Sequence, residues 1–411
     1  MSVPTDKMED MPASAPQPVR HVTDDERRAR LARRHGLHAD HRLSSVEEVV
    51  GAMTVLHATE AASVHLAVAA RSDRSVADVE RALYDDRSVV KQLAMRRTLF
   101  VFPRSLLPAA LASSSARVAV TERARHAGML EKAGHTDDGA TWLREAEAAF
   151  LTVLADGEAR TTAEVRAATP DLDVLVDPAP GKSYSSPTPV APWIMTHLAA
   201  DGLLVRGRNA GHWRINKPTW TLMETWLGEV PSRPDPDEGY AALVAGWLRT
   251  FGPGTEGDLQ WWLGDTKAVV RRALAGLGAV PVSLDSGAVG WVLPDDVAPV
   301  RHVSAWAALL PVLDPTVMGW KARGFYLPDP DRHTDRAGNI GATAWWDGRV
   351  VGAWFQSPDG RVHVSVESEV PAAGRRALEA EAARLTEWLD GEVVGTIYNS
   401  VAAREARAAL G

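Results

Sequence analysis

The sequence predicts an α+β fold in which tandem winged-helix units precede a small β-rich, barrel-like C-terminal domain. Three observations carry this prediction: a helix-start pattern occurs three times, strand–turn–strand patterns follow the helical stretches, and short β-type runs dominate past residue 300. The chain has 411 residues, which is enough for two to four domains at ~100–200 residues each.

The repeated helix-start pattern places a hydroxyl three residues before an acid, with an apolar residue after the acid. This is a capping box, in which the hydroxyl accepts a hydrogen bond from the third helical N–H and the acid reaches back to the cap. It occurs at Ser75 with Asp78, at Thr161 with Glu164 and at Thr255 with Asp258, so the caps are 86 and 94 residues apart. Three occurrences at similar spacing indicate a repeated module.

Each cap is expected to begin a short helix, a turn, a second helix and a β-hairpin, which is the winged-helix order. Units of this kind usually offer the second helix and the hairpin wing to a DNA duplex, although some wings here could pack only against neighbouring units. The expected elements are helix 192–201 with strands 203–208 and 212–215 in the second unit, and helix 267–277 with strands 280–284 and 289–293 in the third.

The C-terminal region has a β character. An Asp347-Gly348 turn is expected to join two strands at 342–346 and 349–355, and a third strand and a long helix follow at 361–366 and 372–388. A charged helix is expected at 24–34, with a basic side that either faces solvent or touches phosphate. The expected domains are a disordered tail at 1–22, winged-helix units at 23–155, 156–230 and 236–296 with a linker at 231–238, and the β-rich domain at 300–411.

Composition narrows the function classes. Cysteine is absent, which excludes disulfides, cysteine-ligated zinc and cysteine nucleophiles. There is no apolar run of ~18 residues and no signal-peptide pattern at the N-terminus, so a cytoplasmic protein without a membrane partner is expected. The net charge of −8 argues against a nucleic-acid binder unless one face is locally basic. The tryptophan pairs at 261–262 and 345–346 are interpreted as core residues rather than base-stacking ones.

One polar cluster interrupts an apolar stretch and is the candidate active site. His57, Thr59 and Glu60 follow Val55-Leu56, and on a helix His57 and Glu60 would share a face. A glutamate there could act as a base or stabilise positive charge, and the histidine could be an acid or a donor. The alternative is structural, with Thr59 and Glu60 as the cap and first turn of the next helix and His57 as a half-buried core residue. Phosphate-binding loops, HExxH and GxSxG motifs are absent, so neither a cofactor nor a metal is expected.

Several phrases together resemble the bacterial winged-helix DNA glycosylase family that includes AlkZ and AlkX. The resemblance covers nearly the whole chain after residue 20, and it implies tandem winged helices in a C shape with a β-rich C-terminal domain. It also implies excision of N7-alkylated purines, including bulky adducts and crosslinks. The phrases are Leu-His-Ala-Thr-Glu at 56–60, the run at 83–103, Phe-Gly-Pro-Gly-Thr at 251–255, Leu-Asp-Pro-Thr-Val-Met-Gly-Trp-Lys at 313–321 and Trp-Asp-Gly-Arg-Val-Val-Gly-Ala-Trp at 346–354.

The family signature Gln-x-Gln or Gln-x-Asp falls on His57 and Thr59, so both of its residues are replaced here. Two hypotheses follow. Either the site is a variant in which Glu60 or His57 handles the water, or the protein binds DNA without catalysis; a protein-binding scaffold is a third class. A cationic N7-alkylpurine is a good leaving group, so one carboxylate that stabilises the sugar cation and positions water would suffice.

The expected partners are double-stranded DNA and alkylated purine lesions, bound by a monomer. Basic residues near the predicted second helices, the wings and the 313–321 phrase are the candidate DNA contacts, and only clustering would set them apart from ordinary surface cations. They are Lys91, Arg96, Arg97, Arg206, Arg208, Lys217, Lys321 and Arg323.

Overall fold

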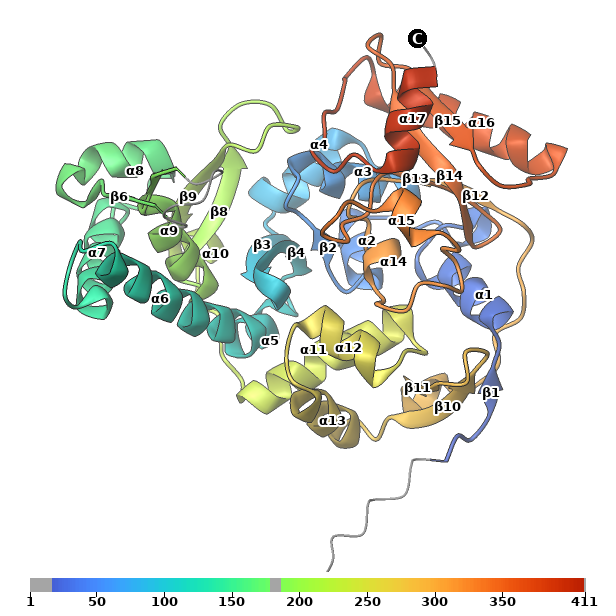
Figure 1. Cartoon of the computed structure of the whole chain (residues 1–411), viewed down its shortest axis with the longest axis horizontal. Helices are drawn as coiled ribbons and strands as arrows, with labels where there is room; N and C mark the ends of the chain where they lie inside the picture. The colour runs from blue at the N-terminus through green and yellow to red at the C-terminus, as the bar shows by residue number, and fades with distance from the viewer. Residues whose placement is uncertain (1–16, 178–185, 410–411) are drawn as a thin grey trace, which may run out of the picture.

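The computed structural model describes residues 17–177 and 186–409 (Figure 1). Residues 1–16 of the predicted tail lie outside this range. Residues 17–22 do not continue such a tail, because β1 (His21–Val22) pairs in parallel with β10 (Val280–Leu284). The prediction of a disordered tail is therefore wrong for this stretch, where two added backbone pairings extend the sheet of the third unit.

The charged helix predicted at 24–34 is present as α1 (Asp24–Arg34). Three of its basic residues, Arg27, Arg28 and Arg30, are buried and so neither face solvent nor remain available to phosphate. Arg30 lies 2.9 Å from both Glu26 and Asp296. Both interpretations of this helix are thus wrong for these three arginines, because acids on the same helix and in the third unit neutralise them.

Three stretches of the chain share one element order: a helix, a strand, two helices and a β-hairpin. In the first two, the strand pairs with the last strand of the hairpin, which gives the sheet orders β2-β4-β3 and β5-β9-β8. In the third, a bridge from Gly254 to Trp291 takes the place of the first strand. The first stretch consists of α2 (Val46–Ala52), β2 (Leu56–His57), α3 (Ala61–Arg71), α4 (Val76–Glu80) with the π-helical turn η2 (Arg81–Asp85), β3 (Val89–Ala94) and β4 (Thr98–Pro103).

Two helices, α5 (Leu107–Ala112) and α6 (Ser114–Lys132), connect the first stretch to the second. The second stretch consists of α7 (Gly139–Val153), β5 (Arg160–Thr161), α8 (Thr162–Ala168), α9 (Ala191–Ala200), β8 (Leu204–Asn209) and β9 (Pro218–Leu222), with α10 (Met223–Leu227) after it. A small antiparallel pair, β6 (Leu175–Val176) with β7 (Thr188–Pro189), lies between α8 and α9. The third consists of α11 (Pro236–Phe251), α12 (Glu256–Leu263), α13 (Lys267–Gly276), β10 and β11 (Val289–Val292).

All three predicted capping boxes are present, at Ser75, Thr161 and Thr255. Their places in the repeated order differ. Thr161 and Thr255 begin the first helix of a pair, α8 and α12, whereas Ser75 begins α4, the last helix before its hairpin. The first cap therefore begins the second helix of its pair, whereas the other two begin the first. A capping box marks the start of a helix but does not identify which helix of a unit it begins. In the first stretch the matching cap position is Glu60, before α3.

One predicted strand is wrong. Residues 212–215 do not return along β8; they belong to the loop that precedes β9, and the register of this hairpin shifts between Arg206 and Asn209. Trp213 explains the difference, because its ring lies 4.8 Å from that of His65 on α3 and 6.3 Å from that of Trp388 on α16 (Ala372–Leu389). The loop thus packs on the first stretch and on the C-terminal region instead of extending its own sheet.

The C-terminal region holds an open antiparallel sheet in the order β12-β13-β14-β15. The strands and turn predicted around Asp347-Gly348 are present, and both turn residues have positive φ. The barrel-like arrangement is wrong, since the described strands β12 and β15 remain at opposite edges. Its elements are β12 (Ala307–Leu310), α14 (Pro315–Met318), α15 (Pro330–His333), β13 (Thr343–Trp346), β14 (Arg349–Gln356), β15 (Val362–Val366), α16 (Ala372–Leu389) and α17 (Val401–Ala409).

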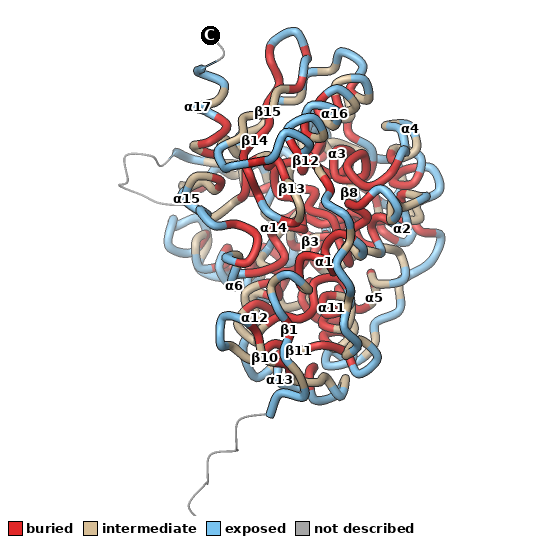
Figure 2. The backbone as a smooth tube through the Cα atoms, turned by 90° about the vertical axis from the view of Figure 1, so that its right-hand side faces the viewer, coloured by how far each residue is buried: buried red, intermediate tan, exposed pale blue. Residues whose placement is uncertain are grey.

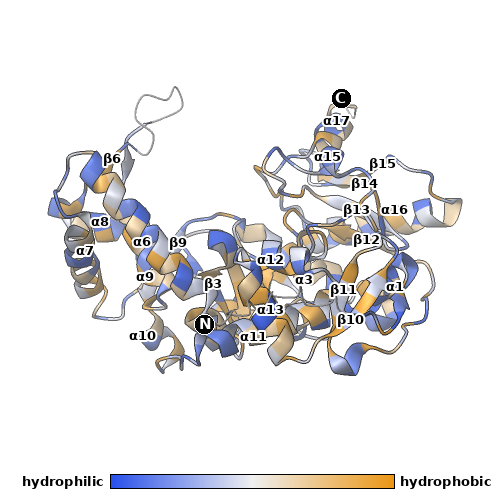
Figure 3. Ribbon diagram, turned by 60° about the horizontal axis from the view of Figure 1, so that its bottom comes forward, coloured by the Kyte–Doolittle hydropathy of each residue, from blue (hydrophilic) through white to orange (hydrophobic). Residues whose placement is uncertain are grey.

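The largest buried cluster joins the first and third stretches to the C-terminal region, and the buried segments of these parts lie in the middle of the molecule (Figure 2). Trp262 and Trp345 are buried, which confirms their interpretation as core residues, whereas Trp261 and Trp346 are partly exposed. The second stretch has its own cluster and stands to one side, opposite the C-terminal sheet (Figure 3). None of the described helices combines the length and the apolar character that crossing a membrane would require.

Candidate active site

The candidate residues lie where β2 runs into α3. His57 belongs to β2 and is paired with Phe100 of β4, while Glu60 is the residue before the first turn of α3, with φ −95° and ψ 130°. The prediction that His57 and Glu60 share a helix face is therefore wrong, because the stretch between them is not helical. Glu60 occupies the cap position of the structural alternative, yet its carboxylate makes no cap hydrogen bond.

His57 is a buried, neutral residue. His57 is 5% exposed, and the centre of its ring lies 4.6 Å from the centre of the Phe100 ring. Burial, together with the nearby charges of Arg96 and Arg323, lowers the pKa of His57 to about 3. Its Nδ1 has no hydrogen-bond partner. A neutral imidazole with one free nitrogen can bind a neighbouring group, but it is a poor general acid at neutral pH.

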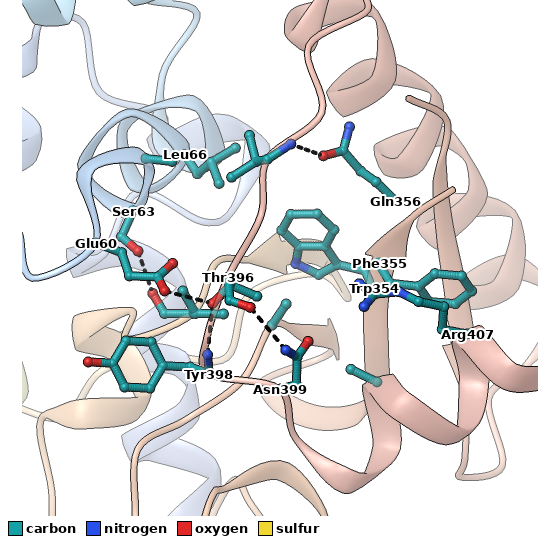
Figure 4. A pocket seen from close by; sticks show the side chains of 15 residues that line it. Glu60, Ser63, Leu66, Trp354, Phe355, Gln356, Thr396, Tyr398, Asn399 and Arg407 are labelled. Carbon is teal, nitrogen blue, oxygen red and sulfur yellow. Dashed lines mark hydrogen bonds between the residues drawn. The ribbon is translucent and has the colours of Figure 1, made fainter. Parts of the chain in front are cut away.

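Glu60 is held by the segment between α16 and α17. The hydroxyl of Thr396 donates to its Oε1 at 3.0 Å (Figure 4). The backbone N–H of Ile397 donates to the same oxygen, also at 3.0 Å. Burial raises the pKa of Glu60 above its usual value, and these two donors act in the opposite direction. The carboxylate is thus fixed by two donors and partly desolvated, and its raised pKa makes it a stronger base than an ordinary glutamate.

Glu60 separates two spaces of different size. On one side, next to Trp354 and Phe355, lies the narrow cavity shown in Figure 4, of about 40 Å³, with room for water only. On the other side lies an open hollow of about 430 Å³, lined by Thr59 and Glu60 together. Sites for small ligands have volumes of roughly 300–1,000 Å³, so the hollow is the one that suits a nucleobase.

The rim of the hollow comes from two loops that the sequence did not single out. Asn216, before β9, donates through Nδ2 to the Thr59 carbonyl at 3.3 Å. From the same loop, Arg214 Nε donates to Glu392 Oε2 at 2.9 Å, and His212 Nε2 lies 3.1 Å from Glu392 Oε1. In the sequence, the one indication that this loop could border a site was the polar composition of residues 214–217 before Pro218. That composition is equally typical of an ordinary turn. Asn216 contacts Thr59 across 157 residues of sequence, a separation that no local pattern spans.

The predicted DNA-contacting cations have different surroundings. Lys91 lies in β3, is buried, and donates from Nζ to the Tyr84 hydroxyl at 2.6 Å. Burial lowers the pKa of Lys91 to about 8, and the prediction that it contacts phosphate is wrong for this conformation. Arg206 is half-buried over the ring of Trp220, and burial lowers its pKa to about 10.

Two of the predicted cations already pair with carboxylates. Arg97 lies 2.8 Å from Glu122, and Arg208 lies 3.0 Å from Glu80 and 2.8 Å from Asp85. Their charges are therefore largely offset within the protein, which weakens the prediction that they attract phosphate. Pairing of this kind depends on contacts between α4 and β8 and between the β3–β4 turn and α6, which no local sequence pattern reveals.

The remaining four differ in exposure. Lys217 and Lys321 are exposed, whereas Arg96 and Arg323 are half-buried and both lie over the ring of one tryptophan, Trp261. The structure therefore brings Arg96 and Arg323 together with His57, and brings Thr59 together with Glu60. Among the residues it describes, no group of three or more His, Asp or Glu side chains is placed to hold a metal ion.

Comparison with known proteins assigns the family. The AlkZ-like DNA glycosylase family model matches residues 50–388. An interstrand DNA cross-link repair glycosylase of Streptomyces sahachiroi is 26% identical over 202 residues, which is 47% of this chain and 53% of that protein, so the chain matches about half of that relative's length. The solved structure of the Streptomyces sahachiroi DNA glycosylase AlkZ matches with a TM-score of 0.67 and 20% identity over 89% of this chain and 97% of that chain, which shows a shared fold. Because the family model covers most of the sequence, the chain belongs to the AlkZ-like DNA glycosylase family.

Proposed function

We propose that the protein is a monofunctional DNA glycosylase that hydrolyses the N-glycosidic bond of alkylated purines. The observation that carries the proposal is the placement of Glu60: a fixed, partly desolvated carboxylate lines a hollow of base-sized volume together with Thr59. Both residues stand at or beside the positions of the family signature. N7-alkylguanine is the simplest substrate, and bulky adducts or crosslinks are included because the Streptomyces relative is named for cross-link repair.

Hydrolysis of this N-glycosidic bond requires few catalytic groups. Water forms a bond to C1′ of the deoxyribose while the C1′–N9 bond breaks, and its electron pair neutralises the cationic base. Positive charge passes to the sugar as the base leaves, so a carboxylate near C1′ stabilises the transition state. Glu60 can supply that charge and accept a proton from the water, and the raised pKa of its carboxyl favours proton transfer at neutral pH.

Thr59 and His57 have secondary roles in this proposal. Thr59 lines the same hollow and its hydroxyl can hold the attacking water. His57 is neutral and buried, so it serves as a hydrogen-bonding neighbour and not as the acid or base. The two donors on Glu60, from Thr396 and Ile397, keep the carboxylate from swinging away when the positive charge develops.

The duplex would be held by the three repeated stretches. Their shared order of helix, strand, helix, helix and hairpin, with matching strand orders in the first two sheets, supports winged-helix modules. The proposed units are those at 23–155, 156–230 and 236–296, followed by the β-rich domain at 300–411. Action as a monomer in the cytoplasm is part of the same proposal.

A second candidate is DNA binding without catalysis. The observation in its favour is that the family's glutamines are replaced by a buried neutral His57 and by Thr59, and that Glu60 already accepts two hydrogen bonds within the protein. Under this alternative Glu60 only ties the segment at 391–400 to the start of α3.

Base release separates the candidates. Purified protein is incubated with duplex DNA that contains N7-methylguanine, and in parallel with duplex carrying a bulky N7 adduct or an interstrand crosslink. Free base and abasic sites measured above the spontaneous rate support the glycosylase. DNA binding that weakens with salt but yields no base from any of these substrates supports the non-catalytic binder, and the absence of salt-sensitive binding contradicts both and leaves a scaffold.

A further inference from the structure

Two arginines from distant parts of the chain converge on one tryptophan. Arg96 lies in the turn between β3 and β4, with its guanidinium carbon 4.1 Å from the Trp261 ring centre, and Arg323 follows α14, at 5.3 Å from the same ring. The turn sits closely on the end of α12, since a Cβ at Gly264 would lie 2.7 Å from Arg96 Cγ. The arrangement is thus built by packing and does not arise from one mobile side chain.

Neither of these two arginines forms an ion pair with a described carboxylate. Among the described residues, no Asp or Glu oxygen lies within 4.0 Å of Arg96 or Arg323, whereas the neighbouring Arg97 lies 2.8 Å from Glu122. Arg323 donates instead to the carbonyls of Trp320, at 3.0 Å, and Gly338, at 3.4 Å. Burial, with the Arg323 charge next, lowers the pKa of Arg96 to about 10, so Arg96 remains a cation at neutral pH.

Three buried nitrogens in this group lack a partner. They are Nε and Nη2 of Arg96 and Nδ1 of His57, whose pKa is lowered in part by the charges of Arg96 and Arg323. Buried donors without acceptors are costly, and such groups in native proteins usually meet water or a ligand. Arg96, Trp261 and Arg323 are each partly exposed, so the group borders the surface, while its three unpartnered nitrogens lie just beneath it.

We propose that Arg96, Arg323 and His57 form a site for a phosphate group, filled by a phosphodiester of the DNA strand that the enzyme binds. A phosphate offers several acceptor oxygens and a negative charge, which match the planar guanidinium donors. A cationic alkylated base would be repelled by the two arginines and therefore belongs at the Glu60 hollow. The DNA source of the phosphate rests on the proposed function; the anion site itself does not.

The location gives the site a positioning role. His57 is in β2, two residues before Thr59, so a phosphate bound at this site would fix the DNA strand relative to the candidate active site. His57 is then a positioning residue that completes the phosphate site. The Gln-to-His replacement leaves a polar side chain there that can still hydrogen-bond.

The salt dependence of binding tests the proposal on undamaged duplex DNA, where no base excision is involved. Removing one phosphate-binding cation reduces the slope of log K against log salt by ~0.9 and lowers affinity by roughly tenfold near 0.1 M salt. Arg96→Gln and Arg323→Gln are each expected to show this decrease. Arg97→Gln is the matched control from the same turn, and it should change the slope less because Glu122 already offsets its charge. Equal slopes for wild type, Arg96→Gln and Arg323→Gln would overturn the proposal.

A spectroscopic readout separates this site from catalysis. In protein with 13C-labelled histidine, titration with inorganic phosphate or with undamaged duplex should shift the ring signal of His57, and Arg96→Gln should abolish the shift. A shift with duplex but not with inorganic phosphate assigns the site to DNA, and a shift with both assigns a general phosphate site. No shift with either contradicts the proposal. All of these results are independent of base release, so failure of the glycosylase proposal would remain distinguishable.

Discussion

Protonation of His57 should make the protein less stable in acid, and the size of the effect follows from its pKa. In the folded protein this pKa is about 3, mainly because the ring is buried, whereas the ordinary value is 6.5. Below pH 6.5 the unfolded chain therefore binds a proton that the folded chain does not. Stability is fully present above pH 6.5 and falls as the pH decreases toward 3, by up to ~1.4 kcal/mol per pH unit.

At pH 5 this difference amounts to ~2 kcal/mol from His57 alone. His57→Gln removes the titrating group and restores the family's residue. Between pH 7 and pH 5, the free energy of unfolding should decrease in both proteins, and the decrease should be ~2 kcal/mol smaller in the variant than in wild type. The measurement is chemical denaturation at several pH values, with the exposed His135→Gln as control. If His57→Gln and wild type lose the same stability over this range, His57 is not the buried neutral residue described above.

Three further predictions concern other parts of the molecule. Asp314→Asn should cost ~3–5 kcal/mol of stability, measured by denaturation, because the Arg71 guanidinium, 2.7 Å from the Asp314 carboxylate and fully buried with it, would lose its counterion; a loss below 1 kcal/mol would contradict this. Glu392→Gln should leave the melting temperature unchanged and raise low-salt DNA affinity by roughly two- to tenfold, since Arg214 at the rim of the hollow is released from its carboxylate; weaker binding would show that the pair is needed for DNA. Base release should decline with acid as the pH falls through the raised pKa of Glu60, because the proton-accepting carboxylate is lost; a rate that rises toward pH 5 would exclude Glu60 as the base.

Local signals in the sequence predicted several of the helices and strands. Capping boxes at Ser75, Thr161 and Thr255 and the Asp347-Gly348 turn depend on residues within a few positions of one another, and all are present. The same locality explains the errors. A cap cannot tell which helix of a unit it begins, and the alternation at 212–215 predicted a strand although Trp213 packs on a distant helix.

The site was only partly predictable, for the same reason. The polar cluster and the family resemblance both identified His57, Thr59 and Glu60, but the surroundings of these residues depend on long-range contacts. The donors on Glu60 lie more than 330 residues away in sequence, and Lys91 is buried by the packing of β3. The sequence therefore identified candidate cations by their charge. Only the folded structure distinguishes the cations that form ion pairs from Arg96 and Arg323, which lie over Trp261.

The most direct measurement is single-turnover base release from N7-methylguanine duplex by wild type and by Glu60→Gln. The glutamine keeps the shape of the side chain, and its oxygen can still accept from Thr396 and Ile397, so only the charge is removed. If Glu60 stabilises the sugar cation and accepts the proton, excision should fall by roughly 10- to 1000-fold, with unchanged or slightly stronger DNA binding and an unchanged melting temperature. Intact excision together with a lower melting temperature would contradict this and make Glu60 a structural residue at the start of α3.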